Sequence, residues 1–316
     1  MIKTALNNNI KKTHKNKKKR MFYFKRDFQL YVLLLIPLTY FLVFKYLPMY
    51  GVIIAFKDYN IFDGVFKSNW IGFDVFREIF KMKDFFSAVK NTFMLNFLDL
   101  FLGFPIPIIL AILINEIRSI KFKKVSQTIL YFPHFISWVI IGGIATQLFS
   151  QTGLVNSFLK TSGLSTIPFL TNGPWWIVTY LFTGIWQGAG WGTILYLAAI
   201  IGINPELFEA AQIDGANRLK RIWYIILPGM KSTIVILLIL NLGQITSIGF
   251  DRPYVLGNAF VHQYSDVIST FVYNIGLVNG RFNVATAVGL FQSLVGVVFL
   301  VGAQFIADKL GEQGIW

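Results

Sequence analysis

The chain has 316 residues and a formal net charge of +14, and it is 55% hydrophobic, 17% aromatic and only 14% charged. Soluble domains carry about 25% charged residues, so this composition, with a mean hydropathy of +0.58, excludes an ordinary soluble enzyme. The absence of cysteine excludes disulfides, thiolate metal sites and cysteine nucleophiles. The positive charge fits either nucleic-acid binding or membrane orientation, and the positions of the basic residues decide between them.

Residues 1–27 form a polar tail that contains ten of the 29 basic residues. Beside an apolar segment, such a block attracts anionic lipid and holds its end of the chain in the cytoplasm. We therefore predict a basic cytoplasmic tail over 1–27 that contacts membrane lipid and binds no nucleic acid. The apolar segment that follows continues to Phe56 without a small-residue cleavage site, which predicts an uncleaved first span over 28–56 instead of a signal peptide.

Five further apolar stretches reach the roughly 20 residues that a membrane helix needs. They cover about 91–114, 126–149, 175–203, 231–250 and 284–307. Their glycines and prolines are common in membrane helices, where neighbouring helices satisfy the freed backbone groups. The alternating pattern of outer-membrane barrels is absent. We predict an all-α integral membrane protein, with a six-helix transmembrane domain over 28–307 and a short cytoplasmic C-terminal tail over 308–316.

The basic residues indicate the orientation of these spans. With the N-terminus inside, 19 basic residues fall in the tail and inner loops, and nine fall in the outer loops. This bias predicts a multi-pass protein of the cell membrane with both termini in the cytoplasm, N-in/C-in. The outer loop over 57–90 has Phe and Ile at helical spacing, which predicts an amphipathic helix at the outer interface. That helix either caps the spans or contacts an extracellular partner.

The inner loop over 204–228 has strong local signals. Asn204, Pro205 and Glu206 predict a helix start, because they supply a cap, a fixed first turn and an acid near the positive end. Asp214 and Gly215 predict a turn, with Asp214 placed to cap the helix that enters the fifth span. The small residues at the tip would let a partner's groove approach closely. A surface helix that only joins two spans is the alternative.

The same loop carries a specific pattern. Glu-Ala-Ala at 209–211, Asp-Gly-Ala at 214–216 and the later Ile-x-Leu-Pro at 225–228 resemble the EAA motif of ABC-importer permease subunits. The stretches KYLPMYGVIIAFKDYN at 45–60, PHFISWVI at 133–140 and GEQGIW at 311–316 resemble the carbohydrate-uptake branch that imports complex oligosaccharides. The resemblance implies the type I importer fold, and a permease that takes up oligosaccharides from an extracellular binding protein.

In that family the EAA segment is the coupling helix that docks on the ATPase. The residues that the resemblance assigns to docking are Glu209, Ala210, Ala211, Asp214, Gly215 and Ala216. It also implies a heterodimer with a second homologous permease subunit, two ATPase subunits and an extracellular sugar-binding lipoprotein. The sequence has no phosphate-binding loop, so ATP and Mg are expected on the partner ATPase. We expect this chain to hold no cofactor or metal and to be a transporter subunit, not an enzyme.

Polar and aromatic groups suited to a sugar path lie on the fourth and fifth spans. The family's sugar site lies on these two spans, and the predicted contacts are Trp186, Gln187, Gly188, Trp191, Asn241 and Gln244. Asn241 and Gln244 would share one helix face. The alternative is that the amides hydrogen-bond neighbouring helices and the glycines only permit close packing. The sequence does not identify the oligosaccharide, nor which of the two permeases makes most of the sugar contacts.

Asp99 is the carboxylate that lies well inside a predicted span, and such a residue usually has a function and a partner. No basic residue is obviously at its depth, so coupling, substrate contact and a hydrogen bond to Asn96 or another helix all stay open. A proton- or sodium-coupled secondary carrier that uses Asp99 is the alternative function, although such carriers predict several intramembrane charges. A membrane-embedded enzyme would need clustered His, Asp or Glu, and the sequence offers no such cluster.

Overall fold

The computed structural model describes residues 26–309, without the side chains of 306–308. The predicted tails over 1–27 and 308–316 therefore lie outside the described residues, apart from the two positions of each that border the helices. Contacts divide the chain into two compact units, residues 1–54 and 55–316. Each unit is described by itself.

Within the described residues, six helical stretches are long and apolar enough to cross a membrane. They are Phe28–Phe56, Lys83–Asn115, Trp138–Thr161, Gly173–Ile201, Arg218–Gly243 and Phe282–Phe305. The six-span, all-helical prediction is therefore confirmed. The bounds of the second, third and fifth spans differ from those that hydropathy suggested.

The described part of the first unit is one long apolar helical segment that passes from α-helix through π-helix to 3₁₀-helix. It contains α2 (Phe28–Phe41), the π-helix η1 (Leu42–Tyr46) and most of the 3₁₀-helix η2 (Leu47–Phe56). Pro37 lies inside α2 without ending it, as is common in membrane helices. The span over 28–56 thus has the predicted bounds.

The second unit begins with a small folded cap. The strands β1 (Lys57–Asp58) and β2 (Asn69–Trp70) pair antiparallel, with the short helix α3 (Gly64–Lys67) between them. The helix α4 (Asp74–Ile79) follows, and its Val75 and Ile79 are buried in a cluster with residues of the last helix. The amphipathic stretch of this loop therefore packs on the spans, as the cap interpretation expects.

The second span starts at Lys83 and is interrupted in the middle. It consists of α5 (Lys83–Leu98), the π-helix η3 (Asp99–Gly103) and α6 (Pro105–Asn115). Pro105 has no N–H to donate to the preceding turn. The backbone of Phe104 instead donates to the carbonyl of Asp99 at 3.2 Å, a wider turn. Such π-segments are frequent at functional sites.

The third apolar stretch, predicted over about 126–149, does not form a single helix. The structure has two helices, α7 (Ile120–Tyr131) and α8 (Trp138–Phe149), joined by the 3₁₀-helix η4 (Phe132–Phe135). Pro133 lies in this junction, and the Ser137 hydroxyl accepts a hydrogen bond from the backbone of Ile140 to start α8. Proline and a new N-cap thus override the apolar pattern. The helix α9 (Leu154–Thr161) follows α8.

The remaining elements complete the unit. They are α10 (Gly173–Ile201), α11 (Pro205–Ile213), α12 (Arg218–Arg221), η5 (Ile222–Ile226), α13 (Leu227–Gly243), α14 (Asp251–Leu256), α15 (His262–Ser265), α16 (Ile268–Val272), η6 (Tyr273–Val278) and α17 (Phe282–Lys309). The fifth span ends at Gly243, not near residue 250, and the chain after it is irregular until α14. This irregular segment proves to line the candidate site.

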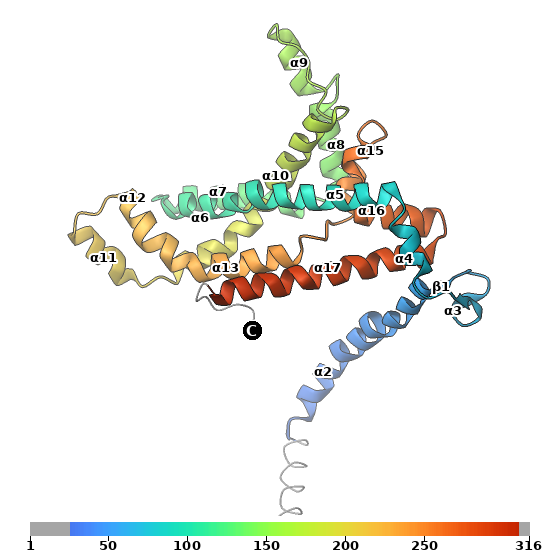
Figure 1. The fold of residues 1–316 in the computed structure, drawn as a ribbon. Helices are drawn as coiled ribbons and strands as arrows, with labels where there is room; N and C mark the ends of the chain where they lie inside the picture. The colour runs from blue at the N-terminus through green and yellow to red at the C-terminus, as the bar shows by residue number, and fades with distance from the viewer. Residues whose placement is uncertain (1–25, 310–316) are drawn as a thin grey trace, which may run out of the picture. The chain divides into compact units, whose positions relative to one another are not determined.

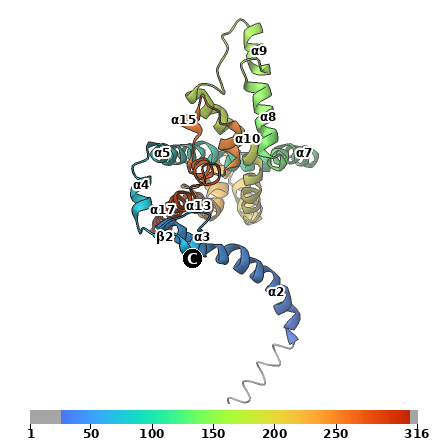
Figure 2. The ribbon, with the colours of Figure 1, turned by 90° about the vertical axis from the view of Figure 1, so that its right-hand side faces the viewer.

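In the second unit, α10 packs along α6 and α13 packs along α17. Figure 1 shows α5, α6, α13 and α17 running alongside one another, with α11 at one end and α4 and α16 at the other. Figure 2 views α13 and α17 nearly end-on. The buried clusters of this unit include one that joins Phe85 to residues of α4, one around Trp176, and one around Met230 against which Phe208 of α11 packs.

Candidate functional site

The inner loop forms the short helix that the sequence predicted. The Asn204 side chain caps α11 by accepting from the backbone of Glu206 at 3.0 Å, and Pro205 is its first residue. Gly215 has φ of +68°, a left-handed conformation that favours glycine because other residues are strained there. The chain therefore turns back sharply after α11.

One local prediction in this loop is wrong. Asp214 does not cap the helix that enters the fifth span but lies at the C-terminal end of α11. Asn217 caps α12 instead, because its side-chain oxygen accepts from the backbone of Lys220 at 2.9 Å. The turn at Gly215 is present as predicted, but the N-cap of the helix that follows it lies three residues later than predicted, at Asn217 instead of Asp214.

No other part of the chain that the structure describes covers the tip of this loop. No residue of α11 is buried, and the side chain of Ile213 is 87% exposed. Phe208 packs against the cluster that contains Met230, which attaches α11 to the helices behind it. Arg218 lies 3.8 Å from the carboxylate of Glu116, at the end of α6. An anchored helix with exposed apolar residues is suited to docking on another protein.

The fourth and fifth spans enclose, with the second, a cavity of about 480 Å³. Its polar lining includes Asn96, Asp99, Asn241, Gln244, Ser247 and Arg252, and its apolar lining comes mainly from α10 and from residues 100–107 of the second span. Pockets of this size, with apolar walls and a few polar groups, are typical binding sites for small organic molecules. A sugar residue fits such a space and such a lining.

Three of the predicted sugar contacts line this cavity: Gly188, Asn241 and Gln244. A Cβ atom on Gly188 would meet no other atom within 4 Å, so this glycine is not required for close packing here. Asn241 donates to the Leu237 carbonyl of its own helix at 2.7 Å. Within the described residues, neither Asn241 nor Gln244 has a recorded side-chain bond to a neighbouring helix.

The other three predicted contacts, Trp186, Gln187 and Trp191, do not line it. Trp186 lines a separate apolar pocket against α8. The Trp191 ring stacks on His134, with centroids 4.6 Å apart and planes at 7°. Gln187 donates to the carbonyl of His134 at 3.4 Å. The structure thus places three of the six residues in the cavity, whereas the other three contact α8 or the junction between α7 and α8.

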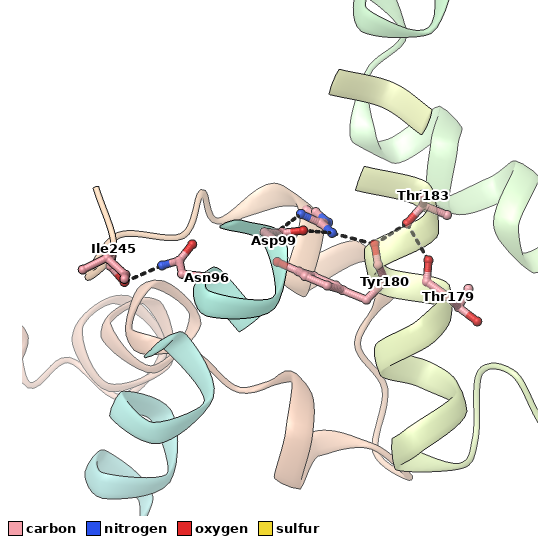
Figure 3. Close-up of polar contacts among 7 residues, drawn as sticks. Asn96, Asp99, Thr179, Tyr180, Thr183 and Ile245 are labelled. Carbon is pink, nitrogen blue, oxygen red and sulfur yellow. Dashed lines mark hydrogen bonds and ion pairs between the residues drawn. The ribbon is translucent and has the colours of Figure 1, made fainter. Parts of the chain in front are cut away.

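Asp99 has a basic partner that the sequence did not reveal. Arg252, counted above as an outer-loop residue, lies at the start of α14, and Nη1 donates to Oδ2 of Asp99 at 2.7 Å. Nη2 donates to Oδ1 at 3.2 Å and to the carbonyl of Tyr180 at 2.6 Å. Asn96, one of the possible partners of Asp99, instead donates to the carbonyl of Ile245 at 2.6 Å (Figure 3).

The surroundings of Arg252 are shaped to hold its guanidinium. The Cζ atom lies 3.6 Å from the ring centroid of Tyr180 and 5.5 Å from that of Trp138, where cation–π attraction is effective. A Cβ atom on Gly184 would overlap the guanidinium. The missing side chain of Gly184 therefore provides the space for Arg252. In the sequence, Gly184 indicates that some group approaches α10 closely. No nearby residue indicates that this group is the side chain of Arg252.

The family model for the binding-protein-dependent transport system inner membrane component matches residues 85–311. The chain belongs to this family. Protein LplB of Bacillus subtilis (strain 168) is 44% identical over 293 residues, which cover 92% of each chain. The polygalacturonan/rhamnogalacturonan transport system permease protein YteP of the same strain is also 44% identical, and the match covers 91% of this chain and 90% of YteP.

Solved structures agree with these relatives. The chain is 42% identical to a chain of a bacterial ABC transporter involved in the import of the acidic polysaccharide alginate, with a TM-score of 0.84 and coverage of 90% and 97%. A second structure holds a bacterial alginate ABC transporter in complex with an alginate pentasaccharide-bound periplasmic protein. It matches at 41% identity and a TM-score of 0.84, over 92% of this chain and 98% of that one.

As an inner membrane component of this family, the chain is a multi-pass permease subunit of an ABC importer with the type I fold. The predicted family is confirmed, and the secondary-carrier alternative is set aside. The chain serves transport and is not itself an enzyme. Permeases of this family carry no cofactor of their own, and over residues 26–309 no group of three or more His, Cys, Asp or Glu could hold a metal ion.

Proposed function

We propose that this chain forms half of the translocation path of an ATP-driven importer for oligosaccharides that an extracellular binding protein delivers. The observation that carries the proposal is the cavity of about 480 Å³ with its amide and hydroxyl lining, in a permease of this family. YteP is named for polygalacturonan and rhamnogalacturonan, and the arabinooligosaccharides permease AraP of the same Bacillus subtilis strain is 29% identical. Acidic and neutral sugar chains are both represented among its relatives.

Gly188, Asn241 and Gln244 make the sugar contacts in this proposal. The amides of Asn241 and Gln244 supply donors and acceptors for sugar hydroxyls, and Gly188 leaves room for a ring against α10. Trp186, Gln187 and Trp191 do not line this cavity and stay predictions from the family resemblance. A second homologous permease supplies the other half of the path, so this chain encloses only part of the sugar.

The loop between α10 and α13 couples the path to ATP. Glu209, Ala210, Ala211, Asp214, Gly215 and Ala216 form the docking element for one of two separate ATPase subunits. The small residues permit close approach, and Ile213 offers exposed apolar area for the ATPase to cover. ATP and Mg bind on the ATPase. Coupling then requires that the docked helix has different contacts in the inward-open and outward-open states.

The orientation that fits this role has both termini in the cytoplasm, as the distribution of basic residues supports. In this orientation α11 faces the ATPases and α4, with the β1–β2 hairpin, faces the exterior. The loaded binding protein, a lipoprotein in the proposal, docks on that outer side. The six-helix domain over 28–307 and the cytoplasmic tails over 1–27 and 308–316 complete the proposed organisation.

Uptake measurements on the assembled complex test the proposal. The chain is reconstituted in proteoliposomes with its partner subunits and the binding protein. Labelled oligogalacturonate and labelled arabino-oligosaccharide are then supplied in separate experiments. We expect at least one of the two sugars to be taken up. This uptake should require ATP on the side of the membrane where the ATPase subunits lie, and a protonophore should not affect it. Uptake that a proton gradient drives without ATP contradicts the proposal, as does failure to transport any oligosaccharide.

The sugar site is tested by Asn241→Leu combined with Gln244→Leu. We expect the half-saturation concentration to rise by about tenfold, because lost hydrogen bonds to polar substrate groups typically cost that much or more. Gln151→Leu, which changes an exposed amide outside the cavity, is the control and should leave uptake unchanged. Equal uptake by the double variant and the control removes these amides from the site.

A further inference from the structure

A second cavity lies directly beyond the first. It has a volume of about 260 Å³, and it shares four lining residues with the larger cavity: Asn96, Asp99, Ser247 and Arg252. Two of these residues, Asp99 and Arg252, form the part-buried ion pair. The two cavities are therefore neighbours, and the Asp99–Arg252 pair belongs to the wall between them.

The two cavities are arranged in order along the path. On α10, the larger cavity is lined from Gly184 to Tyr196, towards α11, whereas the smaller one is lined by Tyr180, nearer the other end. On the second span, the larger cavity is lined from Asn96 to Pro107, whereas the smaller one is lined there only by Asn96 and Asp99. Both segments place the smaller cavity on the far side of the ion pair from the coupling loop.

The two halves of the ion pair are held unequally. Arg252 is fixed by the Tyr180 carbonyl, the Tyr180 ring and the space at Gly184, and its side chain is only 13% exposed. Asp99 is 28% exposed, and within the described part of the chain its carboxylate has no other recorded hydrogen bond. Asp99 also begins the π-helix η3, a winding that can readjust without unfolding the span.

The energetics permit such a pair to open. An ion pair in a low-dielectric wall is stable only while both charges are paired or solvated. Both carboxylate and guanidinium border cavities, so water that enters on separation can solvate each of them. The bidentate geometry gives a defined closed position. A contact of this kind has two discrete states, and a moving helix can shift the balance between them.

We propose that the Asp99–Arg252 ion pair is a gate that closes this chain's half of the translocation path between the two cavities. The gate rests on the proposed transport function. Arg252 is the fixed half, and Asp99 moves with η3 when the path opens. The closed state seen here prevents a sugar in one cavity from reaching the other.

Solvent accessibility tests the gate without any transported sugar. The chain has no cysteine, so Leu195→Cys places a single reporter thiol in the larger cavity. In right-side-out vesicles that contain the assembled complex, a membrane-impermeant cationic methanethiosulfonate is added outside. We expect Asp99→Asn and Arg252→Gln each to raise the labelling rate by about tenfold, as expected when a closed state loses its main stabilising contact.

A matched control removes a different ion pair. Glu78→Gln breaks the 2.6 Å pair between Glu78 and Arg281, which joins α4 to the start of α17 away from both cavities. It should leave the labelling rate unchanged. Co-purification of the partner subunits verifies that each variant has assembled. Unchanged labelling in an assembled Asp99→Asn complex overturns the gate, and so does an equal increase in Glu78→Gln.

A crosslink tests the gate from the closed side. The double variant Asp99→Cys with Arg252→Cys is bridged by a short bifunctional methanethiosulfonate. The crosslink should stop uptake of whichever labelled sugar, oligogalacturonate or arabino-oligosaccharide, the unmodified complex transports. A thiol reductant should restore that uptake. Uptake that continues through the crosslinked protein contradicts the gate. If the unmodified complex imports neither sugar, the transport proposal fails, whereas the labelling result still decides whether the pair closes the cavity.

Discussion

The coupling loop and the cavity wall are built by opposite means. In the loop, each cap joins residues two or three positions apart, as in Asn204 to Glu206 and Asn217 to Lys220. In the wall, the Asp99–Arg252 pair joins residues 153 positions apart. The loop buries none of α11, whereas the wall holds a nearly enclosed guanidinium. One region is shaped by local sequence and left exposed for the proposed partner, and the other is completed within the chain.

This difference separates the expected effects of mutation. Changes in the loop should impair transport while the permease stays folded, because the affected contacts are with another subunit. Changes in the wall should alter both the folded state and the path, because its contacts hold three segments of this chain together. The following predictions test that separation, beginning with the largest effect.

Gly215→Val should reduce transport by about 100-fold, towards the upper range of coupling between linked sites. A β-branched residue is strained at φ of +68°, so the turn after α11 must change and the docking surface with it. Gly163→Val is the control, since Gly163 has φ of +77° in an open loop after α9. Sugar-stimulated ATP hydrolysis and membrane content are measured for both. Normal coupling in Gly215→Val removes this turn from the coupling element.

Gly184→Ala, in the cavity wall, should lower the stability of the permease and also loosen the closed path. The added methyl overlaps the guanidinium of Arg252, and overpacking of this kind costs about 1 to 3 kcal/mol. We expect a lower melting temperature and faster labelling of the Leu195→Cys reporter. Gly143→Ala, on α8 where an added methyl meets open space, should change neither. A Gly184→Ala protein with parental stability and labelling shows that Arg252 does not depend on this space.

Trp191→Ala should have a smaller effect, through the contact between α10 and the α7–α8 junction. Loss of the stacked pair with His134 should cost about 1 kcal/mol. We expect Trp191→Phe to restore most of the stability. The family resemblance instead predicts that Trp191 contacts the sugar. A large rise in half-saturation concentration at unchanged stability would support that role and extend the path beyond the cavity that Gly188 lines.

Asp266→Asn should have the smallest effect. Burial raises the pKa of Asp266 above 3.8, and nearby Asp84 adds to this, while Thr270 and His262 oppose it. The folded state therefore binds this proton more readily than the unfolded state, so its stabilising contribution is full below pH 3.8 and is lost as pH rises through the folded pKa. At pH 7, Asp266→Asn should raise the melting temperature by about a degree. A clear fall in melting temperature contradicts this sign.

Local chemistry explains what could be predicted. Six apolar stretches, the cap at Asn204, the turn at Gly215 and the pattern around Glu209 depend on residues close in sequence, and each was visible before any fold was known. The break at Phe132–Phe135 also has a local cause, because Pro133 lies within it, but hydropathy alone does not place the helix bounds on either side. The cap at Asn217 was missed because the loop offered several acceptable capping residues.

By itself, the sequence determined that the chain has six apolar stretches of membrane-spanning length and a capped helix with a sharp turn in the 204–228 loop, because hydrophobic length and local turn chemistry act over a few residues. Only the tertiary structure decided which of the predicted contact residues share a cavity and which contact α8 or its junction with α7 instead. It also decided that Asp99 is paired, since Arg252 reaches it only when the chain after α13 folds back across Tyr180. Charge pairing over such a separation depends on the packing of whole helices, which no short stretch of sequence encodes.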